Sequence, residues 1–275
     1  MVNCLLDAPA DWNQVRLFAI LYCGTLLLQF SYHFRDQLRF LSTLPPGYET
    51  ARLLGRWRIP VLDSRHFILV GNCFRVCLLC VCAGWFPRLF IAMALAIYFL
   101  YFGQILELSY IRRKTNLIPF IFVILVAAPG TTRPLTETVP GWPLLLVKAL
   151  LALVYFGSAY GKLTRSGLGW ARGEVLQAYL VHHYLCVGTE HALRLARHRA
   201  VTALLSAGTL AFEATFWLIL PFPTLTGVYV LAGLSFHAGT AVVMRIDYFK
   251  YFCLAYLVFA ADALEAARRV LAGQG

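Results

Sequence analysis

Long apolar segments recur along the chain, separated by shorter polar stretches. A transmembrane helix needs about 20 mostly apolar residues. The pattern predicts eight such segments, or seven membrane spans if the fourth segment, which is short, does not cross. They cover about residues 15–32, 67–85, 88–108, 117–128, 143–160, 200–220, 225–244 and 248–264.

Two intervals between these segments are mixed in polarity. Residues 34–66 contain the turn sequence Pro45-Pro46-Gly47 but are too apolar for a flexible linker, so we expect them on the bilayer surface. Within residues 163–199, the stretch 173–185 predicts an amphipathic interfacial helix. Because no internal repeat is evident, the sequence predicts one domain over residues 1–275. Its expected fold class is all-α, a polytopic transmembrane helical bundle with an interfacial helix.

Composition supports a membrane location. Hydrophobic residues make up 60% of the chain and charged residues 13%, and the mean hydropathy is +0.69. Soluble domains are about half apolar and about a quarter charged. These values exclude a soluble or disordered protein and favour a multi-pass integral membrane protein, located in the cell membrane if the source is bacterial.

Basic residues exceed acidic ones by 24 to 13, which gives a net charge of +11. In a membrane protein such an excess is typical of cytoplasmic loops that contact anionic lipid. No recognition motif accompanies the charge, so nucleic acid is not an expected partner. The basic loops follow the first, third, fifth and seventh apolar segments, and the opposite loops hold little beyond Arg88 and Arg133. This distribution predicts that both termini are outside and that residues 163–199 are cytoplasmic.

Eight cysteines are present, and most lie in apolar segments. Cys73, Cys77 and Cys80 share one face of a predicted helix, but no histidine or acidic residue lies within the same turns. Cysteine packs as a small hydrophobic residue in such helices. We therefore expect no metal site.

Ionisable residues inside predicted spans are costly to bury, and each one supports a hypothesis of function. These residues are Arg75, Lys148, Glu213 and His237. A structural interpretation pairs the cations with Glu213 or Glu107 across helices, and a single histidine in an apolar helix is often a core residue. Lys162 lies near a helix end, where lysine often extends to the membrane surface. A desolvated lysine can also act as a base.

The segment 147–163, which ends in Lys162-Leu163, resembles the lysine-leucine motif of the HTTM family. This family includes relatives of the vitamin K-dependent gamma-glutamyl carboxylase. The resemblance extends from about Arg16 to Phe259. Its other matching positions are Trp170, Gly173, Tyr179 to Leu185 with His182-His183, Phe236-His237, Tyr248-Phe249, Arg16 and Asn116.

The resemblance implies a chemistry for Lys162. The matching lysine of the carboxylase deprotonates reduced vitamin K, which reacts with oxygen to form an epoxide. The strong base so generated removes a proton from glutamate, and carbon dioxide then adds. By this resemblance the chain is expected to be a quinone- or lipid-linked lyase or oxidoreductase with a reduced, vitamin K-like quinone as cofactor. His237 or His183 would relay protons or orient groups. The expected pocket residues are Lys148, Glu213, Asn116, Trp170, Tyr155 and Tyr160.

The chain also departs from the carboxylase pattern. The asparagine-histidine pair of the carboxylase corresponds to Asn116-Leu117, and the spacer between Leu163 and Trp170 is longer. The large extramembrane domain that handles the protein substrate is not expected here. The carboxylase active site faces the lumen, whereas the charge pattern assigns Lys162 to the cytoplasmic side. Glutamate carboxylation is therefore not expected.

Two other classes of function remain open at this stage. One is a non-catalytic protein that binds a lipid or quinone, or that acts as a membrane partner in a peptide-export or immunity system. In that case Lys162 pairs with a headgroup. The other is a transporter, for which the sequence offers no inverted repeat and no matched pair of interrupted spans.

Overall fold

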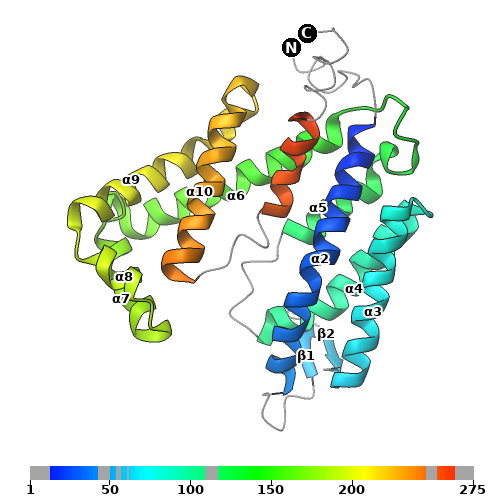
Figure 1. The fold of residues 1–275 in the computed structure, drawn as a ribbon, viewed down its shortest axis with the longest axis horizontal. Coiled ribbons are helices and arrows are strands. Elements are labelled where there is room, and N and C mark those ends of the chain that lie inside the picture. Colours follow the sequence, from blue (N-terminus) through cyan, green and yellow to red (C-terminus); the bar gives the residue numbers. More distant parts are fainter. Residues whose placement is uncertain are drawn as a thin grey trace. The chain divides into compact units, whose positions relative to one another are not determined.

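The computed structural model describes residues 13–42, 50–53, 57–60, 62–108, 117–245 and 253–263. Side chains are described for residues 13–30, 62–100, 117–245 and 253–263. Helices dominate the fold (Figure 1). The chain divides into two compact units, residues 1–146 with 260–275 and residues 147–259. The predicted single domain stays a prediction, and each unit is described by itself.

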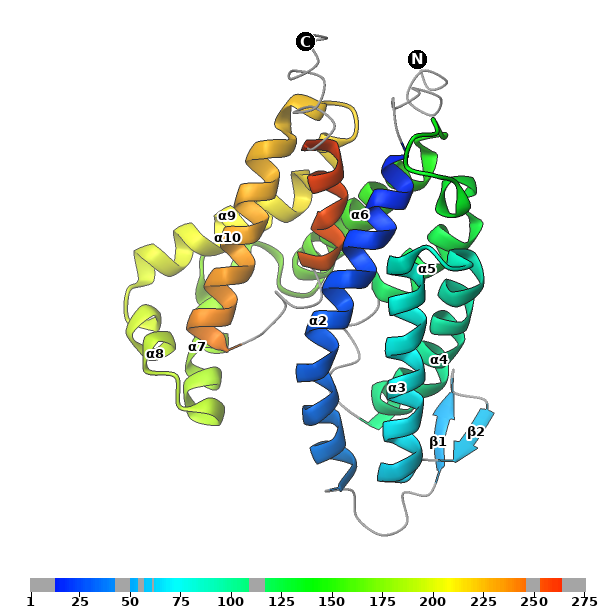
Figure 2. The same cartoon turned by 45° about the vertical axis from the view of Figure 1, so that its right-hand side comes forward.

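Unit 1 is a set of packed apolar helices. Its main elements are α2 (Gln14–Ser42), α3 (Ser64–Ala83), α4 (Pro87–Leu108), α5 (Leu117–Ala127) and the short 3-10 turn η2 (Pro129–Thr132). Helix α2 packs on α3, α3 on α4, and α4 on α5 (Figure 2). Aromatic side chains fill the core, with the ring centroids of Phe30 and Phe74 4.9 Å apart and those of Tyr22 and Phe122 6.1 Å apart.

One short hairpin interrupts the helical pattern of unit 1. Strands β1 (Thr50–Leu53) and β2 (Trp57–Pro60) pair antiparallel, with Arg52 opposite Arg58. The sequence analysis placed this stretch on the bilayer surface and predicted no strand. Asp63 then caps α3 by accepting a hydrogen bond from the His66 backbone N–H at 2.8 Å. That bond holds the pKa of the Asp63 carboxyl below its usual value.

Unit 2 begins within α6 (Trp142–Ser166). It continues through η3 (Gly167–Gly169), α7 (Glu174–Val187), α8 (Glu190–Ala196), α9 (Arg199–Thr215), η4 (Phe216–Ile219), η5 (Pro223–Leu225), α10 (Thr226–Met244) and the first residues of a helix over Cys253–Ala263. Helix α7 packs on α8 and α9. Gly173 precedes α7 with φ of +80°, and a Cβ there would lie 2.7 Å from the Ala203 Cα. Glycine therefore permits the start of α7 to approach α9 closely.

All eight predicted apolar segments contain helix, and the third segment, expected to begin after Pro87 and to end near Leu108, agrees with α4 to within about one residue. The fourth segment is short, as predicted, because α5 has 11 residues. The stretch 173–185 is helical as α7, and its interfacial location stays a prediction. Four helices of the described residues are long and apolar enough to cross a membrane, and the count of about eight spans stays a prediction. The four cover Ser64–Ala83, Trp142–Gly169, Arg199–Ile219 and Pro223–Met244.

Candidate functional site

A nearly buried ion pair joins α6 to α9 in unit 2. The Lys162 ammonium group donates hydrogen bonds to both carboxylate oxygens of Glu213. The two side chains are 17% and 4% exposed. Ser158, about one helical turn before Lys162, donates a further bond of 3.1 Å to Glu213 Oε1. Pairing and hydrogen bonding together offset the cost of holding these charges away from water.

The observed pair corrects the structural interpretation of the sequence. Glu213 has Lys162 as its partner, whereas the sequence analysis proposed Arg75 or Lys148. Arg75, in unit 1, donates to Asn72 at 3.0 Å. Spacing explains why Lys148 does not reach: it lies 14 residues before Lys162, which is about 21 Å along the helix axis. The side chain of Glu107 lies outside the described residues.

The lysine lies over one aromatic ring, which is itself stacked on a second. The Lys162 Nζ lies 4.9 Å from the centroid of the Trp170 ring, within the range of a cation–π interaction. Trp170 stacks on Tyr179, with centroids 6.1 Å apart and planes inclined by 23°. The Ser206 hydroxyl donates to the Trp170 carbonyl oxygen, which fastens this segment to α9. The predicted motif residue Trp170 is thus brought beside the lysine despite the longer spacer.

A second polar group lies deeper in unit 2. The Tyr155 hydroxyl is 2.6 Å from His237 Nε2 and 2.7 Å from the Tyr256 hydroxyl, and all three side chains are buried. A phenol has one proton, so Tyr155 donates to one neighbour and accepts from the other. Rings from α9 and η4 pack against Tyr155, with the Phe212 and Phe216 centroids at 5.0 and 4.5 Å.

The two polar groups share one face of α6. Tyr155, Ser158 and Lys162 follow the i, i+3, i+7 spacing that aligns side chains along a helix. The seven residues from Tyr155 to Lys162 correspond to about 10 Å along the axis. From the resemblance, His237 was expected to relay protons or orient groups for Lys162. The hydrogen bond of His237 instead reaches Tyr155, two turns away.

The remaining predicted site residues lie apart or are not tested. Tyr160 is 63% exposed. It comes two residues before Lys162, a spacing that puts the two side chains on different faces of α6. His183 is half-buried on α7, with its ring centroid 6.1 Å from that of His182, and its role stays a prediction. Asn116 lies outside the described residues.

Three kinds of contact in this site were not predicted from the sequence. Ser158 had a detectable signal, because it precedes Lys162 by four residues on the same helical face. Tyr256 had none, since a phenol in an apolar segment gives no indication of its partner. Phe212 and Phe216 are typical of any apolar helix.

In the part of the chain that the structure describes, no group of three or more histidine, cysteine or acidic residues could hold a metal ion. Cys73, Cys77 and Cys80 lie along α3 as free thiols.

Comparisons with known proteins identify one relationship. No curated protein and no solved structure matches the chain. A family model described as the HTTM domain matches residues 57–263, well over half of the chain. The matched residues include the Lys162-Leu163 motif, Trp170 and the Phe236-His237 pair. The HTTM domain is a membrane domain of carboxylase-like proteins, in agreement with the apolar helices. The chain therefore belongs to the HTTM family.

Proposed function

We propose that the protein is a membrane enzyme that removes a proton from a hydroxyl group of an apolar substrate, with Lys162 and Glu213 as its acid–base pair. The observation that supports this proposal is the contact between an amine and a carboxylate that are both largely sheltered from water. Ionisable pairs of this kind in membrane segments are typical of proton-transfer sites. Membership of the HTTM family supports the same class of chemistry.

The pair can hold one proton in two ways. In the ionic form the ammonium is stabilised by the carboxylate, and in the neutral form the proton lies on Glu213 and the Lys162 amine is free to accept another. A medium of low polarity reduces the free-energy difference between these forms, because separated charges are poorly solvated there. Ser158 donates to the same carboxylate and so orients it.

A reduced quinone fits the residues around Lys162. It is flat, aromatic and apolar, and it presents a hydroxyl group, which the amine requires as a proton donor. The stacked Trp170 and Tyr179 rings offer an aromatic surface within 4.9 Å of the ammonium group. When bound, the quinone supplies an acidic hydroxyl and redox chemistry. A lipid with a hydroxylated headgroup would use the same contacts.

In this proposal the hydrogen-bonded side chains of Tyr155, His237 and Tyr256 hold the helices in place and do not contact the substrate. Their hydrogen bonds tie α6 to α10 and to the last helix, so the α6 face that bears Lys162 is held in place. Tyr155, His237 and Tyr256 are therefore positioning residues rather than catalytic ones.

One observation favours a second function, binding without catalysis. The Lys162 ammonium already has a carboxylate and an indole ring as partners, as in a structural ion pair. A non-catalytic protein would use the same residues to hold a quinone or lipid, or to stabilise a surface for a membrane partner.

Variants of the pair distinguish the two functions. The full chain, purified in mild detergent, is supplied with reduced vitamin K-type quinone and dioxygen, and products and bound molecules are followed by mass spectrometry. Lys162→Arg keeps the charge and the ion pair but provides no base, since guanidinium stays protonated. The double variant Lys162→Met with Glu213→Leu removes both charges together, which often leaves stability unchanged. Arg165→Gln removes an exposed cation one turn further along α6 and is the control.

We expect wild type and Arg165→Gln to turn over alike. Lys162→Arg and the double variant should lose roughly 10²- to 10⁴-fold in rate, the usual contribution of a positioned base, while they still bind the quinone. A fully active Lys162→Arg would rule out the base role. Bound quinone without turnover in wild type would favour the binding function.

A further inference from the structure

Three arginines gather at one end of unit 1, away from the residues discussed so far. Arg16 lies at the start of α2, Arg88 at the start of α4, and Arg133 follows η2. Arg16 Nη1 donates to the Arg133 carbonyl oxygen at 3.3 Å, and Arg88 Nη2 donates to the Ala128 carbonyl oxygen at 3.1 Å. A Cβ at Gly84 would overlap the Arg16 guanidinium, so Arg16 also lies against the turn between α3 and α4.

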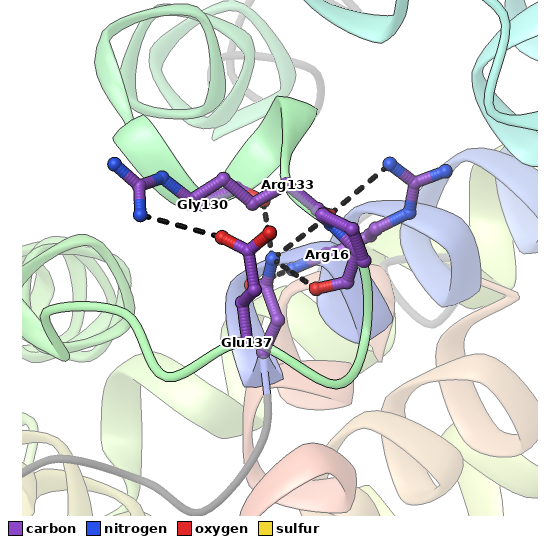
Figure 3. Close-up of polar contacts among 6 residues, drawn as sticks. Arg16, Gly130, Arg133 and Glu137 are labelled. Atoms are coloured by element: carbon purple, nitrogen blue, oxygen red, sulfur yellow. Dashed lines mark hydrogen bonds and ion pairs between the residues drawn. The ribbon is translucent and has the colours of Figure 1, made fainter.

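A buried asparagine holds this end together. The Asn13 amide donates to the carbonyl oxygens of Gly130, Arg133 and Pro134 at 2.6, 3.1 and 3.2 Å. Its own carbonyl oxygen accepts from the Arg16 backbone N–H at 2.9 Å. Figure 3 shows Arg16, which projects from α2, beside the loop that carries Gly130 and Arg133, with the Arg133 guanidinium directed at Glu137. The backbone that carries the cations is therefore fixed before any ligand arrives.

The charge of this cluster is only partly neutralised. Arg133 pairs with Glu137 at 3.3 Å. Among the described residues, neither Arg16 nor Arg88 has a carboxylate partner, and each has one hydrogen bond to a carbonyl oxygen. A guanidinium has five donors, so both keep donors for an anion, and phosphate is the anion that arginine binds best.

An apolar surface begins beside these cations. Trp85 and Phe86, in the turn between α3 and α4, are 68% and 76% exposed. Phe86 has φ of +37°, a conformation that bulky residues rarely adopt, and its ring is held outward. Leu89 and Met93 follow one turn apart on α4 and are also exposed. Aromatic residues at the ends of spans are typical of the headgroup level of a bilayer.

We propose that this end of unit 1 binds an anionic phospholipid, with its phosphate held by Arg16 and Arg88 and its acyl chain along Leu89 and Met93. Free phosphate would need only the cations, whereas the exposed aromatic and aliphatic residues beside them match a lipid. The site does not depend on the acid–base function of Lys162.

Short-chain lipids test the site directly. The full chain in neutral detergent is titrated with dihexanoyl phosphatidylglycerol, dihexanoyl phosphatidylcholine or inorganic phosphate, and binding is measured by native mass spectrometry and by the shift in thermal unfolding. Arg88→Gln removes one phosphate contact. Leu89→Asp adds a carboxylate to the exposed first turn of α4, where a helix tolerates it, and removes no polar contact. Arg165→Gln, an equal change of charge in unit 2, is the control.

Saturable binding of phosphatidylglycerol, with little binding of the other two compounds, is expected for wild type and Arg165→Gln. Arg88→Gln and Leu89→Asp should both bind it about tenfold more weakly. Arg88→Gln loses one charge-assisted contact to the phosphate, and the carboxylate of Leu89→Asp repels the phosphate and is unfavourable beside an acyl chain. Phosphatidylcholine has the same phosphate group but no net charge, so its equal binding would show that the surface does not select an anionic lipid. Equal binding of inorganic phosphate would show a simple anion site. Either result, or unchanged affinity in both folded variants, would overturn the proposal.

Discussion

A single hydroxyl group, that of Tyr155, connects three helices of unit 2. It contacts His237 on α10 and Tyr256 on the last helix, and it projects from α6. Because the surroundings are aromatic and buried, water cannot replace either contact. This hydroxyl should therefore matter more for stability than most phenols in the chain.

Substitution of Tyr155 by phenylalanine tests this inference. Tyr155→Phe leaves the imidazole of His237 and the hydroxyl of Tyr256 each without this partner, so we expect the free energy of unfolding to fall by about 1–3 kcal/mol. Tyr256→Phe breaks one of the two bonds and should have a smaller effect. Thermal unfolding in detergent measures both. Tyr160→Phe, in an exposed phenol of the same helix, should leave the unfolding temperature unchanged, and a similar loss there would contradict the argument.

The residues of the candidate site were predictable to different degrees. Lys162 and Glu213 stand out in the sequence because charge is costly in an apolar segment. Their pairing does not follow from the sequence, since it depends on how α6 and α9 face each other in space. Tyr155 was predicted as a pocket residue because it lies on the same helix as Lys162. Tyr256 can be identified only from the packing of the last helix.

At the scale of the element, one glycine, Gly233, allows α10 to pack closely against Tyr256 of the last helix. A Cβ at Gly233 would overlap the Tyr256 hydroxyl and approach the adjoining ring carbon to 2.7 Å. The absence of a side chain at this position is therefore what lets the last helix bring Tyr256 to Tyr155.

Alanine substitutions along α10 separate close packing from helix propensity. Gly233→Ala should destabilise the protein by about 1–3 kcal/mol, the usual effect of overpacking, because α10 or Tyr256 must shift. Gly239→Ala is the matched control, since a Cβ there meets nothing within 4 Å. Alanine is the better helix former by up to about 1 kcal/mol, so Gly239→Ala should be neutral or stabilising. Equal unfolding temperatures for the two variants would show that Gly233 has no packing role.

The apolar pattern of the sequence predicts the helices, but it does not predict the β1–β2 hairpin. Twenty apolar residues in a row leave few alternatives to a helix, which is why α3 and α4 begin and end close to the predicted residues. Strands β1 and β2 have four residues each, and β1 lies beside α4. Whether such short strands form depends on residues far away in the chain, so the local sequence predicts them poorly.

At the scale of the whole chain, the residues that match the HTTM family do not have the same boundaries as the two packed units. The HTTM match begins at residue 57, after α2 has ended, yet α2 packs on α3 and supplies Phe30 to the aromatic core of unit 1. The segment before the matched region is thus part of the folded unit.

The structure of unit 1 also predicts on which side of the membrane the two ends of α3 lie. Helix α3 has 20 residues, or about 30 Å, which equals the thickness of the hydrocarbon core. The α3–α4 turn and the loop after α5 meet at one end of the unit, through Arg88 and Ala128. Arg65, at the other end of α3, should therefore lie across the membrane from both.

Cysteine labelling measures this arrangement. With the eight native cysteines replaced by alanine, single cysteines are introduced as Arg65→Cys, Trp85→Cys and Thr132→Cys, at exposed positions. Residues 34–66, which precede most of α3, hold six arginines, more than the three at the other end, so they are expected on the cytoplasmic side. A membrane-impermeant maleimide should therefore label Trp85→Cys and Thr132→Cys in intact cells, and Arg65→Cys only after the cells are opened. The reverse pattern would refute the charge-based orientation but keep α3 as a span. Labelling of all three from one side would show that α3 does not cross, because its two ends would then face the same compartment.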